Sequence, residues 1–368
     1  MIRVLLVDDS ALARRLIARV LTSQEGFEVV GEASDPYMAR DRIVELRPDV
    51  TILDLEMPRM DGISFLKRLM HHFPVPVVVC SSLTQGGGDT ALRALCAGAV
   101  AVVNKPTDAQ SVPHMAAELA TAVRAAAATR RVLPGSHAPE ARVASAPSTA
   151  RPPARSAAEI RASSDCRVIV IGASTGGTTA VESIVTGLPQ GGAPVVIVQH
   201  LPPYISEAFA RRLDGLGPLN VEVARDGASL KRGTAIVAPG GKHLLLERRG
   251  TELLVSVRNG AKVNGHRPAV DVLFQATAEA AGADAIGVLL TGMGRDGAEG
   301  LLALRCAGAL TLAQDKASSV VWGMPKAAID IGAADEVLPL ARIAARLARA
   351  MARSSGADRS SIPSRTTS

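Results

Sequence analysis

Residues 167–179, R-V-I-V-I-G-A-S-T-G-G-T-T, decide the fold of the second half of the chain. The branched apolar run at their start predicts a buried strand of a parallel sheet. A glycine-rich turn and a helical pattern from residue 178 onward follow it. A serine in such a strand–turn–helix unit stands at the sheet edge beside free backbone N–H groups. Ser174 is therefore a candidate nucleophile, although an isolated G-x-S-x-G is at least as often an ordinary turn.

The composition predicts a globular protein, because 47% of the 368 residues are hydrophobic. A chain of this length can hold two or three domains. The four cysteines lie far apart, which argues against zinc or a disulfide framework and fits a reducing compartment. No apolar run reaches the about 18 residues that a membrane span needs, and the N-terminus does not resemble a signal peptide. We expect a cytoplasmic protein with no membrane insertion.

The net charge of +6 comes from two segments with no helix or strand pattern. Residues 124–165 carry seven arginines against three acidic residues, and residues 353–368 carry three against one. The remainder is neutral as a sum, whereas a DNA-binding domain presents a basic face on folded structure. Aromatic residues, at 2%, also leave little for base stacking. We predict no nucleic-acid partner.

In the first half, five apolar runs alternate with helical patterns, which predicts a doubly wound parallel sheet. The strands are expected at residues 2–7, 27–31, 50–53, 75–80 and 99–103. Polar residues stand at the ends of four of them: Asp8 and Asp9, Asp54, Ser81, and Lys105. Because the carboxyl ends of parallel strands share one edge of a sheet, we expect these residues to form a site.

These residue types suit phosphoryl transfer to a carboxylate. Three acids close together repel one another unless a divalent cation neutralises them, and hard oxygen ligands select Mg²⁺. The ammonium group of Lys105 would offset charge on a phosphoryl group carried by Asp54. The Ser81 hydroxyl could reach one of its oxygens.

The same stretch resembles the response-regulator receiver domain, which has a flavodoxin-like five-stranded fold. The matching motifs are D-D-S at 8–10, D-L-E-M-P-x-M-D-G at 54–62, S-S at 81–82 and K-P at 105–106. The resemblance implies a phosphoacceptor at Asp54, phosphoryl-sensing roles for Ser81 and Lys105, and a Mg²⁺ site formed by Asp8, Asp9, Asp54 and the backbone of Glu56. Val102 departs from the pattern, because many receivers carry an aromatic switch residue there.

In the second half, His200 and Asp296 also follow predicted buried strands. The run 194–199 ends at His200, and the run 285–290 precedes T-G-M-G-R-D-G and a helix over 298–307. Ser174, His200 and Asp296 can therefore meet at one edge of a parallel sheet as a catalytic triad. Their chain order differs from the Ser…Asp…His order of α/β-hydrolases, so we disfavour that fold.

Two other functions stay open at this point. Residues 292–297 match G-x-G-x-x-G after a strand, and Asp315 lies near the position of a ribose-binding acid, as in a dinucleotide site. Against it, the match comes late in its domain and would place Asp296 beside a pyrophosphate. The other alternative is a phosphorylation-switched binding protein with a vestigial triad, and the intact triad argues against it.

The second half resembles the catalytic domain of the chemotaxis protein-glutamate methylesterase (CheB) family. The matching segments are I-G-A-S-T-G-G at 171–177, V-Q-H-L-P-P at 198–203, A-P-G-G-x-H at 238–243, G-H-R-P-A-V-D-V-L-F at 265–274, L-T-G-M-G-R-D-G at 290–297 and D-x-x-S-x-x-V-x-G-M-P at 315–325. The resemblance implies a doubly wound α/β methylesterase domain. Its activity would be that of a serine hydrolase that demethylates glutamate methyl esters, and deamidates glutamines, on methyl-accepting chemoreceptors.

In that resemblance Ser174 is the nucleophile, His200 the general base and then acid, and Asp296 its orienter. The N–H groups of Thr175 or Met293 are candidate oxyanion donors. His266 and Arg267 are candidates for the substrate groove, and loop anchoring is an equal alternative for them. The esterase reaction needs no cofactor, a chemotaxis histidine kinase is the expected phosphodonor, and we expect a monomer.

Composition and resemblance together divide the chain into four parts. These are a receiver domain at 1–125, a flexible Ala-, Pro-, Arg- and Ser-rich linker at 126–165, a methylesterase domain at 166–352 and a disordered tail at 353–368. We expect the unphosphorylated receiver to cover the approach to Ser174 and phosphorylation to open it by shifting the population of the two states.

Overall fold

A computed structural model describes residues 1–57, 61–82, 87–105, 112–129 and 167–357. The chain divides into two compact units, Met1–Ala144 and Ser145–Ser368. Helices α5 (Val112–Thr129) and α12 (Leu340–Ala357) run past the predicted domain boundaries at residues 125 and 352, so both boundaries fall within helices. The rest of the predicted linker and tail lies outside the described residues.

The first unit is built on the predicted five-stranded parallel sheet, and its strand order is β2-β1-β3-β4-β5. The central strands β1, β3 and β4 are largely buried and apolar, because helices cover both faces of the sheet, whereas the edge strand β2 is partly exposed. Its elements are β1 (Ile2–Val7), α1 (Ala11–Thr22), β2 (Phe27–Ala33), α2 (Pro36–Leu46), β3 (Val50–Leu53), α3 (Gly62–His72), β4 (Val77–Ser81), α4 (Gly88–Cys96), β5 (Ala101–Asn104) and α5 (Val112–Thr129).

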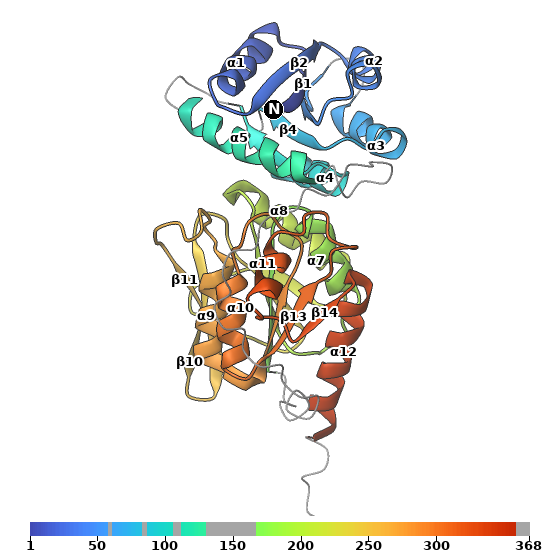
Figure 1. The fold of residues 1–368 in the computed structure, drawn as a ribbon. Coiled ribbons are helices and arrows are strands. Elements are labelled where there is room, and N and C mark those ends of the chain that lie inside the picture. The colour runs from blue at the N-terminus through green and yellow to red at the C-terminus, as the bar shows by residue number, and fades with distance from the viewer. Residues whose placement is uncertain (58–60, 83–86, 106–111, 130–166, 358–368) are drawn as a thin grey trace, which may run out of the picture. The chain divides into compact units, whose positions relative to one another are not determined.

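Helices α1 and α5 cover one face of this sheet and α2, α3 and α4 cover the other (Figure 1). Side chains from alternate strand positions, such as Val4 and Leu6, form a core with Leu21 of α1 and Leu119 of α5. Ser10 caps α1 by accepting a hydrogen bond from Ala13 N–H (3.3 Å), which begins the helix directly after β1. The cap therefore leaves residues 8 and 9 in the turn at the sheet edge.

The second unit has a seven-stranded parallel sheet with strand order β14-β13-β12-β6-β7-β9-β8 and a separate antiparallel hairpin, β10-β11. The central strands are buried along their whole length. The elements are β6 (Val168–Ala173), α7 (Gly177–Thr186), β7 (Val195–Gln199), α8 (Pro203–Asp214), β8 (Asn220–Val223), β9 (Thr234–Val237), β10 (His243–Arg249), β11 (Glu252–Arg258), α9 (Val270–Ala281), η1 (Gly282–Asp284), β12 (Ala285–Leu289), α10 (Ala298–Cys306), β13 (Leu310–Gln314), α11 (Met324–Asp330), β14 (Glu336–Leu338) and α12 (Leu340–Ala357).

Helices α7, α8 and α12 pack on one side of this sheet, and α9, α10 and α11 on the other, beside the hairpin (Figure 1). Phe274 of α9 and Leu301 of α10 lie at the centre of the core on the second side. After β6, the chain adds β7, β8 and β9 on one side of β6. It later adds β12, β13 and β14 on the other side. Strand order therefore reverses between β6 and β12, which is where ligands bind in doubly wound sheets.

Candidate active site and carboxylate cluster

The three adjacent strands β12, β6 and β7 bring Asp296, Ser174 and His200 to one edge of the sheet. Ser174 N–H donates to the carbonyl oxygen of Thr291 (3.0 Å), in the turn after β12. His200 N–H donates to the carbonyl oxygen of Ala173 (3.1 Å), at the end of β6. The sheet ladder thus continues into the three turns that carry the candidate triad.

His200 and Asp296 form a buried pair. His200 Nε2 lies 2.8 Å from Asp296 Oδ2, and their side chains are only 8% and 1% exposed. The opposite ring nitrogen, Nδ1, is buried and has no hydrogen-bond partner in the described part of the chain. Since one ring nitrogen is fixed by the carboxylate, the other is the atom left for a serine hydroxyl. Within the described residues, however, Ser174 Oγ and His200 form no hydrogen bond, a contact that in many enzymes tightens only when substrate binds.

Four donors converge on the Asp296 carboxylate. Besides His200, they are Asn264 Nδ2 (3.0 Å), Val270 N–H (2.7 Å) and Asp271 N–H (3.2 Å). Burial raises the pKa of Asp296, but the hydrogen bond and charge of His200 and the other donors outweigh it and lower the pKa to about 2. Asp296 is therefore ionised at neutral pH and able to stabilise an imidazolium on His200.

The turn that carries Ser174 depends on close packing. The carbonyl oxygen of Ser174 accepts hydrogen bonds from Gly177 N–H and from Gln199 Nε2, both at 2.8 Å. Gly176 has φ +74°, and a Cβ there would meet the Val320 side chain at 2.5 Å. Glycine fits this position because it has no Cβ and adopts positive φ without strain.

The N–H groups of Thr175 and Met293 donate no hydrogen bond to any described residue, which leaves them available to an oxyanion. The Thr291 hydroxyl, in the same turn as Met293, has one hydrogen to donate and lies within hydrogen-bond distance of the carbonyl oxygens of Thr175 (3.0 Å) and Val321 (3.2 Å). Thr175 lies just before the N-terminus of α7, whose dipole favours negative charge.

The two predicted groove residues behave differently. Arg267 is exposed and donates from Nη1 to the carbonyl oxygen of Gly260 within its own loop. His266 instead stacks on His200, with ring centroids 3.7 Å apart and an interplanar angle of 12°. Asn264 and Asp271 are parts of the site that the sequence did not reveal. Asp271 is the last residue of the motif G-H-R-P-A-V-D at 265–271, and its place in that motif is the sequence signal that could have identified it.

Gly292 is packed directly against the candidate nucleophile. A Cβ at this position would lie 2.8 Å from Ser174 Cβ and 2.2 Å from Met324 Sδ, in a fully buried environment. We expect Gly292→Ala to displace Ser174, to cost about 1–3 kcal/mol of stability through overpacking, and to lower kcat by ~10–100-fold. Calorimetry and turnover measurements check both. The matched control is Gly215→Ala, whose Cβ would meet nothing closer than 3.6 Å, and equal effects in the two variants would contradict the prediction.

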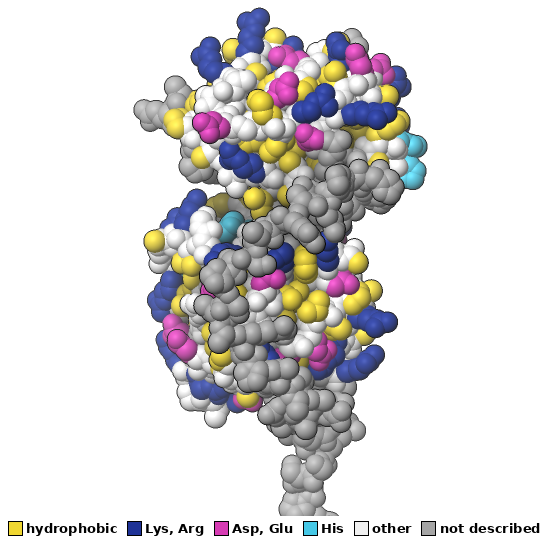
Figure 2. Space-filling view, in the orientation of Figure 1, with side chains coloured by type: hydrophobic (Ala, Val, Ile, Leu, Met, Phe, Trp, Pro, Cys, Tyr) yellow, Lys and Arg dark blue, Asp and Glu magenta, His cyan; other side chains and the backbone are white. Residues whose placement is uncertain are grey.

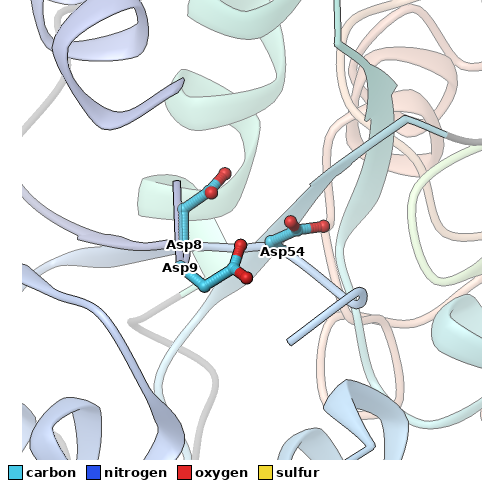
Figure 3. Close-up of side chains that lie close together, drawn as sticks. All are labelled: Asp8, Asp9 and Asp54. Atoms are coloured by element: carbon cyan, nitrogen blue, oxygen red, sulfur yellow. The ribbon is translucent and has the colours of Figure 1, made fainter. Parts of the chain in front are cut away.

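In the first unit, Asp8, Asp9 and Asp54 form a carboxylate cluster at the ends of β1 and β3 (Figure 3). Their ligand atoms all lie within 4.8 Å of one another. Lys105 Nζ joins two of these acids, at 2.7 Å from Asp8 Oδ2 and 2.6 Å from Asp54 Oδ2. Four of the five residues predicted to meet at this edge of the sheet, Asp8, Asp9, Asp54 and Lys105, therefore do so.

Charges in this cluster are strongly coupled. Burial raises the pKa of Asp54 more than Lys105 lowers it. Burial lowers the pKa of Lys105, but its bonds to Asp54 and Asp8 raise it further, so the ammonium group stays charged. Three crowded carboxylates with a single cation leave negative charge, and their hard oxygens fit Mg²⁺. A bound Mg²⁺ would supply charge neutralisation for an incoming phosphoryl group.

Two further predicted residues surround the cluster. Ser81 is fully buried at the end of β4, and its hydroxyl has no hydrogen-bond partner among the described residues. Such a group needs an acceptor or donor, and a phosphoryl oxygen would supply one. Glu56 donates its N–H to Asp54 Oδ1 (3.2 Å), while its side chain accepts a hydrogen bond from the Ser82 hydroxyl. Val102, at the expected switch position, is buried in β5.

Two family models match the chain: a response regulator receiver domain at residues 4–117 and CheB methylesterase at residues 169–347. Protein-glutamate methylesterase/protein-glutamine glutaminase 4 of Anaeromyxobacter dehalogenans is 49% identical over 348 residues, which cover 95% of this chain and 94% of that protein. The chain belongs to the CheB methylesterase family. A second relative, protein-glutamate methylesterase/protein-glutamine glutaminase 2 of Rhodospirillum rubrum, is 48% identical over 356 residues, which cover 95% of this chain and 98% of that protein.

Among solved structures, the CheB methylesterase catalytic domain of Thermotoga maritima is 40% identical, with a TM-score of 0.49 over 50% of this chain and 97% of that one. The two family models confirm both resemblances, and as a CheB methylesterase the protein is a carboxylic ester hydrolase. A dinucleotide site has no support, because Asp296 is already occupied by protein donors. None of the described helices is long and apolar enough to cross a membrane.

Proposed function

We propose that the protein is a phosphorylation-activated serine hydrolase that demethylates glutamate methyl esters, and deamidates glutamines, on methyl-accepting chemoreceptors. The observation that carries the proposal is the buried His200–Asp296 pair at the sheet edge where Ser174 also lies, with His200 Nδ1 unoccupied. The names of the curated relatives supply the substrate class, because both are protein-glutamate methylesterases/protein-glutamine glutaminases.

The chemistry proceeds by two acyl transfers. Ser174 Oγ attacks the ester carbonyl carbon and its proton passes to His200 Nδ1. The carbon–oxygen bond to the methoxy group then breaks, and methanol leaves with the proton from His200. Water attacks the acyl-enzyme with His200 again as base, which releases the receptor glutamate and restores the serine. A glutamine substrate follows the same steps with ammonia as the leaving group.

Backbone N–H groups of Thr175 and Met293 would hold the oxyanion in each step. Asp296 keeps Nε2 protonated and stabilises the imidazolium, which fixes Nδ1 as the atom that exchanges the proton. These roles require no metal ion or cofactor at the esterase site.

The regulatory half of the proposal lies in the receiver unit. A chemotaxis histidine kinase would transfer a phosphoryl group to Asp54, with Asp8, Asp9 and the backbone of Glu56 holding Mg²⁺. Ser81 and Lys105 would contact the phosphoryl oxygens. The unphosphorylated receiver would cover the approach to Ser174, and the phosphoryl group would favour the open state. Deleting residues 1–129, through the end of α5, should then raise esterase activity above that of the unphosphorylated full chain. If the activity is no higher, the receiver does not cover the approach to Ser174.

The decisive experiment measures methanol release from methylated receptor membranes, with and without a small-molecule phosphodonor and Mg²⁺. We expect release by the wild-type protein to rise with phosphodonor, and Asp54→Asn to keep basal release but lose all stimulation. Chelating Mg²⁺ should likewise remove the stimulation of the wild-type protein and leave its basal release unchanged. Asp41→Asn, an exposed acid paired only with Arg40 in the described structure, is the matched control. No release under any condition, while Asp54 is still phosphorylated, would favour a binding protein or another ester substrate.

Three further expectations belong to this proposal. The protein would work in the cytoplasm, as a monomer, and without a nucleic-acid partner. Light scattering of the phosphorylated and unphosphorylated chain checks the monomer, and a dimer in either state would contradict it.

A further inference from the structure

A tight turn between β11 and α9 contacts both members of the His200–Asp296 pair. Val263 and His266 close the turn by exchanging two backbone hydrogen bonds, Val263 N–H to His266 O (3.0 Å) and the reverse (2.9 Å). Two side chains of the turn face the pair: Asn264 contacts Asp296, and His266 contacts His200. The closed turn fixes these two side chains relative to each other.

Asn264 uses both hydrogens of its amide group on buried carboxylates. Nδ2 donates to Asp296 Oδ1 (3.0 Å) and to Asp271 Oδ2 (2.6 Å). The ionised carboxylate of Asp296 only accepts hydrogen bonds, so it selects the NH₂ end of the amide. Asp271 is itself held by Gly300 N–H (2.7 Å) at the start of α10. The orientation of Asn264 is therefore determined, and with it the position of Asp296.

His266 covers one face of the His200 ring. The rings are almost parallel and 3.7 Å apart, which is van der Waals contact. His200 is thus held at Nε2 by Asp296 and across one face by His266, so its ring cannot turn about the Cβ–Cγ bond without breaking a contact. Burial and the neighbouring charge of His200 lower the pKa of His266 to about 4, so His266 is neutral at pH 7. A neutral aromatic face attracts an imidazolium, whereas a charged one would repel it.

We propose that the turn Val263–His266 is a positioning element of the esterase site, in which Asn264 holds Asp296 and His266 holds the ring of His200 with Nδ1 directed to the nucleophile. This assigns His266 a role on the catalytic histidine in place of a direct contact with substrate. The inference rests on the proposed roles of Ser174, His200 and Asp296.

The kinetic test compares His266→Ala, His266→Phe and Asn264→Gly in the full-length protein, with kcat and KM measured separately on methylated receptor membranes. We expect His266→Ala to lower kcat by ~10–100-fold with KM nearly unchanged, because misplacing a catalytic group costs this much. His266→Phe keeps an uncharged ring and should recover most of the loss. Asn264→Gly removes the amide while tolerating the left-handed backbone at this position (φ +52°), and should lower kcat similarly.

A double variant tests whether Asn264 and His266 both act through the His200–Asp296 pair. If they do, His266→Ala with Asn264→Gly should lose less activity than the product of the two single losses, because the second change acts on a pair already misplaced. Losses that multiply would mean that the two residues act independently, and the proposal of a single positioning element would be wrong.

A second readout does not depend on turnover. The proton shared by His200 Nε2 and Asp296 should give a far-downfield proton NMR signal in the wild-type protein, and Asn264→Gly should shift or broaden it. A raised KM with unchanged kcat in His266→Ala would instead mean that His266 binds substrate. An unchanged NMR signal in Asn264→Gly would also overturn the inference. Failure of the wild-type protein to release methanol, with the NMR shift intact, would count against the proposed substrate and not against the positioning role.

Discussion

Replacing Ser174 with alanine is expected to abolish methanol release from methylated receptor membranes, with a loss of at least ~10⁵-fold in kcat. The reason is that Ser174 directly follows β6, between the strands that lead to His200 and Asp296, whereas the Thr291 hydroxyl at the same sheet edge is already hydrogen-bonded to backbone carbonyl oxygens. Removing a nucleophile abolishes the acyl-enzyme, so the residual rate reflects only oxyanion binding and orientation. Single-turnover methanol release, with and without phosphodonor, measures the loss.

The change should leave the fold and the receiver intact. Ser174 donates and accepts through its backbone in the described structure, so alanine removes no hydrogen bond of the folded state. Asp54 should therefore accept phosphate normally in the variant. Ser183→Ala, on the exposed face of α7, is the matched control and should keep full activity. If Ser174→Ala retained even a few per cent of wild-type release, the nucleophile would have to lie elsewhere.

Much of both sites could be predicted from the sequence because parallel sheets collect their strand ends at one edge. The sequence placed a polar residue at the end of each of four apolar runs: Asp8, Asp54, Ser81 and Lys105. The strand order β1-β3-β4-β5 makes those runs neighbours in the sheet. Ser174, His200 and Asp296 follow the neighbours β6, β7 and β12 for the same reason. An apolar run of five or six residues is a local signal, so its end is predictable without tertiary information.

The bounds of β2, β4 and β5 differ from the predicted ones by up to two residues. The fourth strand was predicted at 75–80, but β4 spans Val77–Ser81. Pro76 lies before it and has no N–H to donate to the ladder, although its carbonyl oxygen accepts from Thr51 N–H (2.9 Å). Ser81 therefore belongs to the strand itself, which explains why its hydroxyl is fully buried.

The supports of the triad could not be predicted, because they come from a different part of the chain. Asn264 precedes Asp296 by more than thirty positions, and nothing local marks its amide as the partner of two buried carboxylates. The stacking of His266 on His200 likewise depends on the turn after β11, whose position over His200 no local pattern specifies. Such contacts are set by tertiary packing rather than by periodicity.

Asp296→Asn should lower kcat by ~10⁴-fold while changing KM little, because an amide cannot replace the carboxylate in either orientation. With its nitrogen toward His200, the amide donates to Nε2, so the ring proton moves to Nδ1, which then cannot accept the proton of Ser174. With its nitrogen in the place of Oδ1, the amide presents N–H groups to the donors Asn264 Nδ2 and Asp271 N–H, so both of these hydrogen bonds are lost. Methanol release measures the loss, and Asp330→Asn, an exposed acid on α11, is the control.

The same substitution has a second consequence, which depends on pH. The folded-state pKa of Asp296 is about 2, below its ordinary value of 3.8, so its ionisation stabilises the fold above pH 4 and this stabilisation is lost as pH falls toward 2. The depressed pKa corresponds to about 2 kcal/mol at neutral pH. The gap in unfolding free energy between wild type and Asp296→Asn should therefore shrink by about 1 kcal/mol between pH 7 and pH 3. Trp322 is the single tryptophan and lies in the second unit, so its fluorescence in urea reports this unfolding alone. A gap that does not change with pH would mean that the donors around Asp296 hold its position without stabilising its charge.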